Sequence, residues 1–226
     1  MQKKVVIYGI GDLANHIFRL LKWYTPISVA AFTADGPFIR SKAFLDLPLV
    51  DFKTIEITHP PEDFDMLVLI GYRRMRDRKL LFDKAKAKGY GLVNYLAPGS
   101  HIAQDVVLGE NNLIFPGATI DAFVEIGHDN IVRPNTLIGH NLIIGNHNYI
   151  APGCSIGGFS RIHDLCYIGI GSTIIDHVIL ADETLIGAGS LVMKNTEPAT
   201  LNFGRPAQKK GVHPDTGILV KGHNHG

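Results

Sequence analysis

A histidine at a predicted turn is the first side chain in this sequence that could carry chemistry. His140 lies in Leu137-Ile138-Gly139-His140-Asn141, where the aliphatic pair indicates a short strand and the next residues a turn. A turn residue points outward, and an exposed imidazole titrates near neutral pH, so His140 can accept a proton as a general base. A solvated surface histidine remains the alternative, because the chain contains 11 histidines.

A glycine-rich turn near the N-terminus could bind a phosphate. Gly9-x-Gly11-x-x-Ala14 follows an apolar run and precedes an apolar-periodic stretch, an order that surrounds a phosphate with backbone amides and a helix N-terminus. Asp35 follows Gly11 by 24 residues, near where nicotinamide-binding domains place their ribose-binding acid. The predicted sheet holds only about one mononucleotide-binding half, which favours a nucleotide-bearing substrate over a nicotinamide cofactor. Glycines that serve only strand-helix packing are the alternative.

The other metal-binding and redox-active side chains lack the spacing of a site. Cys154 and Cys166 do not have the spacing of metal ligands, and a single disulfide between them could not hold together a chain of 226 residues. The histidines of the six-residue repeats contain no close pair, which argues against zinc. These histidines are His128, His140, His147, His163 and His177. The sequence therefore predicts no metal site.

The composition excludes several classes of function. Lys and Arg together number 22 and Asp and Glu 21, so the net charge is +1, without the basic excess of nucleic-acid or membrane-surface proteins. No apolar run approaches the roughly 20 residues of a spanning helix, and no signal peptide is visible. The sequence predicts a soluble, cytoplasmic protein with no nucleic-acid or membrane partner.

An internal repeat defines the second half of the chain. Every sixth residue is aliphatic, a period that fits no helix and is typical of a parallel β-helix. One aliphatic side chain per six residues points into a narrow core, and about five coils result if three repeats form one triangular coil. The repeat consists of Ile102, Leu108, Ile114, Ile120, Ile126, Val132, Ile138, Ile144, Ile150, Ile156, Ile162, Ile168, Ile174, Leu180, Ile186 and Val192.

The first 100 residues have the pattern of an α/β domain. Apolar runs at 5–8, 29–32, 66–70 and 92–96 predict four strands, and residues 77–89 look helical. Strands that alternate with helices imply a small doubly wound, Rossmann-like sheet. The predicted domains are 1–99 for this α/β domain, 100–197 for the β-helix and 198–226 for a C-terminal tail.

The order of these features resembles a known family. The N-terminal glycine turn, the uninterrupted repeats, Gly139-His140-Asn141-Leu142-Ile143-Ile144-Gly145 and the tail Gly204-Arg205-Pro206-Ala207-Gln208-Lys209 resemble the sugar O-/N-acyltransferases. These are of the sialic-acid O-acetyltransferase and bacillosamine-pathway N-acetyltransferase type, and the similarity covers about residues 3–210. The resemblance implies a left-handed β-helix and a homotrimer with active sites at subunit interfaces. Acetyl-CoA would lie along the helix, and the N-terminal domain would hold a nucleotide-linked sugar.

The resemblance also implies a role for individual residues. His140 would be the catalytic base with Asn141 beside it, and Gly158 would contribute an N–H to the acyl oxyanion. Further contacts are Ile170 and Ala188 for the donor, and Gly9, Gly11, Asp35, Arg133 and Tyr149 for the substrate. No metal is implied.

The chain departs from the family at four of these places. Family members usually show Gly-Gly-Gly-Gly-His where this chain has Gly9-Ile10-Gly11-Asp12-Leu13. At the position of Asn141 they usually have Asp or Glu. At the position of Tyr149 they often have a second histidine, and at the position of Arg133 a small polar residue. Asn141 could orient the imidazole but cannot neutralise an imidazolium ion.

The leading hypothesis is acetyl-CoA-dependent N-acylation of the 4-amino group of a nucleotide-linked deoxysugar, for surface glycan or lipopolysaccharide synthesis. Alternatives are O-acetylation of a sugar hydroxyl, a non-catalytic trimeric scaffold that senses a nucleotide, and a nicotinamide oxidoreductase. The nucleotide base, the sugar stereochemistry, the size of the acyl group and the role of residues 211–226 stay open.

Overall fold

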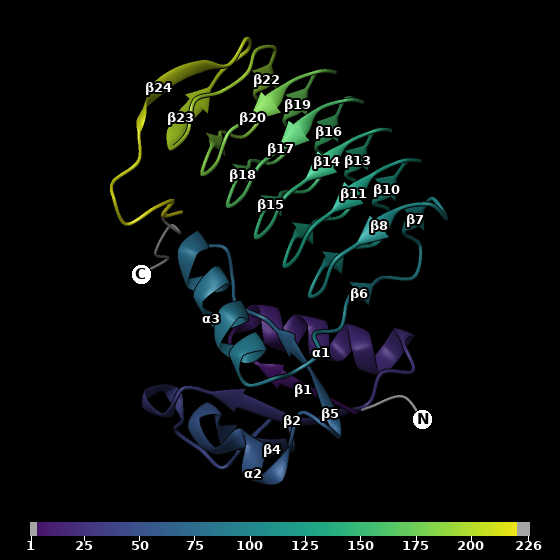
Figure 1. The fold of residues 1–226 in the computed structure, drawn as a ribbon, viewed down its shortest axis with the longest axis vertical. Coiled ribbons are helices and arrows are strands. Elements are labelled where there is room, and N and C mark those ends of the chain that lie inside the picture. Colours follow the sequence, from purple (N-terminus) through teal and green to yellow (C-terminus); the bar gives the residue numbers. More distant parts are fainter. Residues whose placement is uncertain (1–3, 221–226) are drawn as a thin grey trace. The chain divides into compact units, whose positions relative to one another are not determined.

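The computed structural model describes residues 4–220 and contains two compact units. The first unit comprises residues 1–71 and 77–94, and the second comprises 72–76 and 95–226. Figure 1 shows the α/β elements of the first unit and the stacked short strands of the second. The predicted domain boundaries stay a prediction, and the end of the predicted tail, 221–226, lies outside the described residues.

A parallel sheet forms the core of the first unit. The apolar run at the N-terminus becomes the central strand β1 (Lys4–Tyr8), between β2 (Val29–Ala34) and β5 (Phe64–Val68). Beyond β2, β4 (Leu47–Asp51) continues the sheet in parallel, and the short β3 (Ala43–Phe44) ends it with an antiparallel pairing. Parallel strands are covered on both faces, which explains their continuous apolar sequences.

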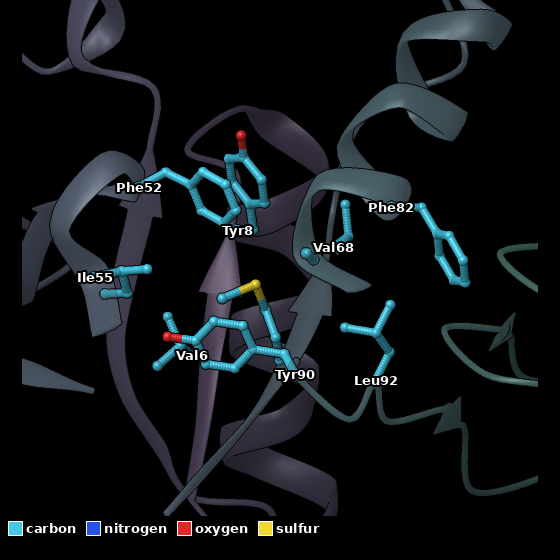
Figure 2. Packing of buried hydrophobic residues seen from close by; sticks show 10 residues of the cluster. Val6, Tyr8, Phe52, Ile55, Val68, Phe82, Tyr90 and Leu92 are labelled. Atoms are coloured by element: carbon cyan, nitrogen blue, oxygen red, sulfur yellow. The ribbon is translucent and has the colours of Figure 1, made fainter. Parts of the chain in front are cut away.

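Helices cover the two faces of this sheet. On one face, η2 (Phe52–Thr54), α2 (Ile55–Thr58) and α3 (Met75–Ala87) contribute to a buried cluster, shown in Figure 2. The cluster consists of Val6, Tyr8, Phe52, Ile55, Met66, Val68, Phe82, Ala85, Tyr90 and Leu92. The other face receives α1 (Asp12–Tyr24), which buries Ala14, Ile17 and Leu21. The 3-10 turn η1 (Gly36–Phe38) follows β2 directly.

The predicted fourth strand at 92–96 is wrong in part. Leu92 makes one parallel bridge to Met66, but β6 (Tyr95–Leu96) pairs with β9 of the second unit. The Tyr95 ring is buried and packs edge-on against Phe115, with the ring centroids 6.0 Å apart. A short apolar run fits either sheet, and the neighbouring strand decides which one it joins.

Three sheets, parallel except for the antiparallel pair β23–β24, build the second unit as a β-helix. The first sheet contains β7 (His101–Ile102), β10 (Thr119–Ile120), β13 (Leu137–Ile138), β16 (Ser155–Ile156), β19 (Thr173–Ile174) and β22 (Leu191–Val192). The second contains β8 (Val107–Leu108), β11 (Glu125–Ile126), β14 (Ile143–Ile144), β17 (Arg161–Ile162) and β20 (Ile179–Leu180). The third contains β6, β9 (Leu113–Ile114), β12 (Ile131–Val132), β15 (Tyr149–Ile150), β18 (Tyr167–Ile168), β21 (Leu185–Ile186), β23 (Thr200–Phe203) and β24 (Gln208–Val212).

The repeat predicted from the sequence sets the register of these sheets. Strand residues pair with those 18 positions away, for example Ile120 with Ile138, so each coil contains three six-residue repeats. The repeat residues from Ile114 to Val192 are almost completely buried, each contributing about 1.5–3 kcal/mol relative to exposure. The parallel β-helix is therefore confirmed. Its left-handed sense and the Rossmann-like character of the first unit stay predictions.

The turns between the sheets form three corners. We call the turns 121–124, 139–142, 157–160 and 175–178, between the first and second sheets, together with residues 193–196 that follow β22, the His140 corner. The turns 115–118, 133–136, 151–154, 169–172 and 187–190, between the third and first sheets, are the Ile170 corner. The remaining turns, 109–112, 127–130, 145–148, 163–166 and 181–184, are the Asn146 corner.

Candidate active site

His140 lies exposed at the turn after β13, as its position in the repeat predicts. Its Nδ1 is 2.9 Å from Oδ1 of Asn141. The Asn141 oxygen only accepts hydrogen bonds, so Nδ1 carries the proton and the Nε2 lone pair is available. Asn141 has a φ of +54°, a left-handed conformation that asparagine adopts more readily than most residues. In its neutral form the imidazole therefore has Nε2 available to accept a proton.

Gly158 occupies the position of His140 in the next coil. A Cβ atom on Gly158 would lie 3.0 Å from the carbonyl oxygen of His140 and 3.1–3.2 Å from Cε1 and Nε2 of its ring. Glycine is therefore the residue that leaves the Nε2 edge of the imidazole open.

The three corners differ in whether the backbone N–H of the second turn residue has a hydrogen-bond acceptor. At the Asn146 corner the second turn amide is capped by a side chain of the next coil: Glu110 by His128, His128 by Asn146, Asn146 by Asp164 and Asp164 by Asp182. At the Ile170 corner, Pro116, Pro134 and Pro152 hold the same position and have no N–H. Among the described residues, no acceptor is bound to the N–H of Gly158, Ile170 or Ala188. These three amides can donate to a ligand.

The predicted donor contacts lie at a different corner from His140. Ile170 follows β18 and Ala188 follows β21, so both belong to the Ile170 corner, and both side chains are exposed. Within one chain the structure therefore brings His140, Asn141 and Gly158 together, but not Ile170 and Ala188 with them.

Arg133 and Tyr149, both predicted to bind substrate, also lie away from the His140 corner. The Arg133 guanidinium lies over the Phe115 ring, 4.1 Å from its centroid, at the Ile170 corner. Tyr149 is on the outer face of the third sheet, where its ring stacks on Tyr167 and contacts Tyr72. Only 6% of Tyr149 is exposed, so within one chain a substrate has little access to it.

The first unit contains a cavity of about 500 Å³ around the glycine turn. Gly9, Gly11 and Asp35 line it, as the sequence predicts for a nucleotide site. Gly9 has a φ of +138°, and a Cβ there would clash with the Leu69 carbonyl, so the turn requires glycine. Gly11 is the N-cap of α1 and has no side-chain cap, which leaves the helix N-terminus open to an anion.

Asp35 is held in this cavity by two donors. The Tyr8 hydroxyl donates to Oδ1 at 2.8 Å, and Nζ of Lys84 lies 3.1 Å from Oδ2. Burial, with the hydrogen bond to Asp35, raises the pKa of Tyr8, so its hydroxyl stays protonated and donates. Lys84 was not singled out from the sequence because it looked like one of several solvated helix lysines.

A second cavity, also of about 500 Å³, lies at the C-terminal end of the β-helix. Lys194 at the His140 corner lines it, together with Pro206 and Ala207 of the tail motif and with Lys209. Lys194 lies three coils beyond His140, which corresponds to about 14 Å at the usual spacing of neighbouring strands. Lys194 follows His140 by 54 residues, three times the 18-residue length of a coil, and this interval was the sequence signal that could have identified it.

Comparison with solved structures identifies the architecture. No protein-family model and no curated protein matches the sequence. PerB from Caulobacter crescentus, in complex with CoA and GDP-perosamine, is 26% identical, with a TM-score of 0.82 over 93% of this chain and 99% of that one. The acetyltransferase domain of PglB from Neisseria gonorrhoeae FA1090 is 18% identical, with a TM-score of 0.78 over 92% of this chain and 100% of that one. WeeI from Acinetobacter baumannii AYE is 20% identical, with the same TM-score and coverage. The structural neighbours are hexapeptide-repeat sugar acyltransferases.

The resemblance to hexapeptide-repeat sugar acyltransferases drawn from the sequence is thereby confirmed. The PglB acetyltransferase domain has also been solved with acetyl-CoA, the donor that the sequence predicts, and PerB has been solved with CoA. Across residues 4–220, no group of His, Cys, Asp and Glu side chains is arranged to hold a metal ion. In the same range, no helix has the length and apolar composition needed to cross a membrane.

Proposed function

We propose that this protein is an acetyl-CoA-dependent N-acyltransferase that acts on the 4-amino group of a nucleotide-linked deoxysugar, in surface glycan or lipopolysaccharide synthesis. The observation that carries the proposal is the His140 corner, where an imidazole with a free Nε2 edge adjoins the uncapped N–H of Gly158. PerB, at 26% identity, is a perosamine N-acetyltransferase that binds CoA and GDP-perosamine, which supports an amino-sugar acceptor.

In the proposed reaction the sugar amine attacks the thioester carbonyl. The new C–N bond forms as the carbonyl π electrons move onto oxygen, and the Gly158 N–H stabilises the developing oxyanion. His140 Nε2 takes the proton from the attacking nitrogen, while Asn141 accepts from Nδ1–H and orients the ring. Collapse of the intermediate breaks the C–S bond, and the imidazolium returns the proton to the CoA thiolate. Base catalysis of this kind increases the reaction rate about 10²–10⁴-fold.

Two cavities of the chain could bind the acetyl-CoA donor and the nucleotide-linked sugar acceptor of the proposed reaction. A pantetheine arm that runs along the His140 corner from a thioester at His140 would bring the CoA phosphates near Lys194, about 14 Å away. The glycine turn, the open N-terminus of α1 and Asp35 form the proposed nucleotide pocket. In this role Lys84 would neutralise Asp35 and prevent its repulsion of a diphosphate.

A complete site would need two chains in the proposed homotrimer. His140 and Gly158 are at one corner of the β-helix, whereas the Ile170 and Ala188 amides are at another. A donor that contacts both sets must therefore lie in a cleft between neighbouring subunits. Arg133 and Tyr149 would contact substrate only from such a neighbour.

The reaction is tested by incubating the protein with acetyl-CoA and UDP-, dTDP- and GDP-linked 4-amino sugars, with the matched 4-hydroxy sugars as controls. We expect CoA release with an amino sugar. Release with the hydroxy sugars alone would instead establish O-acetylation. A thermal shift with NAD(P) but not with CoA would favour an oxidoreductase.

The role of His140 is tested with His140→Ala, for which we expect kcat to fall about 10²–10⁴-fold. Both substrates should still bind, because the change removes the proposed base and leaves the two cavities intact. Histidine variants of PerB have been solved with CoA and GDP-perosamine. An unchanged rate would remove the catalytic assignment and favour a non-catalytic role for this corner.

A further inference from the structure

An aromatic residue next to Gly158 occupies a strained turn position. Phe159 has a φ of +58°, in the left-handed region that bulky side chains rarely adopt. It is also 50% exposed, so burial of apolar surface does not account for its presence. The same φ recurs at the third turn position of other coils, for example at Phe123 and His177, so the geometry of the coil accounts for it. Phe159 differs from Phe123 in its printed ring contact with His140.

Phe159 contacts His140 through both its ring and its backbone. The two ring centroids are 5.1 Å apart and the ring planes are nearly perpendicular, at 89°. The Phe159 N–H donates to the His140 carbonyl at 3.1 Å. On its other side the Phe159 ring stacks on His177, with the centroids 5.0 Å apart and the planes within 3°. His177 therefore restricts the Phe159 ring, which in turn borders the imidazole.

His140 needs a contact of this kind because its hydrogen-bonded partner is weak. Asn141 is exposed and neutral, and a hydrogen bond to an amide oxygen holds an imidazole less firmly than one to a carboxylate. An exposed imidazole with this partner alone can rotate and lose the orientation of Nε2 toward the Gly158 side of the corner.

We propose that Phe159 is a positioning residue that keeps Nδ1 of His140 on Asn141 and the Nε2 edge beside Gly158. The inference rests on the proposed function of His140 as the base. Phe159 acts through the imidazole, so its loss should change kcat rather than the KM for acetyl-CoA or for the sugar.

The first test is Phe159→Ala, with Phe159→Tyr as the conservative variant. We expect kcat to fall about two- to tenfold in Phe159→Ala, which corresponds to the loss of an edge-to-face ring pair. Both KM values should stay within about twofold of wild type, and Phe159→Tyr should keep the wild-type kcat. If Phe159→Ala changed KM or the free energy of unfolding and left kcat at the wild-type value, the proposal would be overturned.

Two asparagine variants separate positioning from backbone strain. Phe159→Asn puts a residue that tolerates left-handed φ at this turn, so it should be at least as stable as wild type and yet lose kcat. Phe123→Asn is the matched control, because Phe123 lies at the same corner, has a φ of +59° and is 67% exposed. We expect Phe123→Asn to keep the wild-type kcat. A kcat loss in both variants, or in neither, contradicts a specific role for Phe159.

A readout that needs no turnover separates this proposal from the function on which it rests. Nuclear magnetic resonance of ¹⁵N-histidine reports the tautomer of His140, with His140→Gln used to assign the signal. We expect the Nδ1–H tautomer to dominate in wild type and a mixture of tautomers in Phe159→Ala. The proposal fails if the tautomer does not change. If the tautomer changes while wild type transfers no acyl group to any acceptor, Phe159 positions His140 but the proposed reaction is wrong.

Discussion

At the scale of single residues, the partner of His140 sets the chemistry of the site. Asn141 Oδ1 favours the tautomer with the proton on Nδ1, but a neutral amide would give no charge stabilisation to the imidazolium of the proposed transfer. Gly158 and the Phe159 ring also border the imidazole. The proposed site therefore combines an oriented base with an oxyanion donor and contains no acid-base dyad.

We expect Asn141→Asp to move the acid limb of the kcat/KM-pH profile to higher pH. A carboxylate beside Nδ1–H favours the protonated imidazole, so His140 must lose its proton at a higher pH to serve as the base. The measurement is the pH dependence of kcat/KM for wild type and Asn141→Asp. Asn141→Ser serves as the control, because it shortens the side chain without adding charge. Identical acid limbs in wild type and Asn141→Asp would contradict a role for His140 as the base.

The two cysteines should not react with thiol reagents in the folded protein. Both are buried, and burial raises the pKa of Cys166 to about 12 and also raises that of Cys154. At pH 8 the thiolate fraction of Cys166 is then about 10⁻⁴, and only the thiolate is the nucleophile. Ellman's reagent should therefore detect CoA release without protein background, and it should detect two thiols after denaturation in guanidinium. Rapid labelling of the folded protein would contradict this burial.

The sequence predicted which residues could act, but not which ones lie together. The turn position of His140 and the placement of Asp35 after the second strand follow from local patterns, and the structure places both as expected. Arg133 and Tyr149 were chosen because they occupy family positions, and whether they face a substrate depends on a neighbouring chain. Phe159 was missed because aromatic residues at a turn usually indicate packing rather than chemistry.

At the scale of elements, the regular repeat was far more predictable than the irregular sheet. Each six-residue repeat buries one aliphatic residue, so sequence period and structural period coincide along the β-helix. In the first unit β4 was not predicted, because Pro48 interrupts its apolar run and a proline normally weakens a strand assignment. Tyr95 was assigned to the wrong sheet because a two-residue strand carries no periodic signal of its own.

The segment 213–220 forms a strap within the second unit. It pairs with residues 72–76 through an antiparallel bridge between Arg74 and Leu219 and a hydrogen bond from Val220 N to the Arg73 carbonyl. Arg76 fastens the same segment, because its guanidinium binds both oxygens of Glu183, at 2.6 and 2.8 Å, and also the Asp215 carbonyl. Residues 211–220, which the sequence left without a role, thus fix the chain that leads into α3.

We expect Arg76→Ala to loosen this strap while leaving the β-helix intact. Loss of the guanidinium removes the hydrogen bonds to Glu183 and Asp215, so the backbone amides of Gly217 and Val220 should exchange with solvent at least about tenfold faster. Hydrogen exchange measured by mass spectrometry checks this, with the β15 and β18 amides as the internal reference. Lys79→Ala is the matched control, because its ion pair with Asp83 lies on the exposed surface of α3. Equal exchange in all three proteins would show that Arg76 does not hold the strap.

At the scale of the whole molecule, the separation of the two corners decides how many chains an active site needs. In the proposed site, the His140 corner supplies the base and the oxyanion donor, and the Ile170 corner supplies two open amides. A site that uses both must be shared between copies of the chain. Two variants that each damage one corner should therefore complement each other when they are assembled together.

The first variant is His140→Ala, and the second carries both Ile170→Pro and Ala188→Pro. Proline suits these two positions because Pro116, Pro134 and Pro152 occupy the same turn position in earlier coils, so the change removes the N–H while the β-helix should keep its fold. Each variant alone should have little activity at low acetyl-CoA. In random mixed trimers, about one site in four receives an intact His140 from one chain and intact amides from its neighbour, so about one quarter of the wild-type activity should return. Sites built within a single chain would recover nothing, because every chain in the mixture is damaged at one corner. Circular dichroism and light scattering of both parents establish that lost activity does not reflect lost folding or assembly.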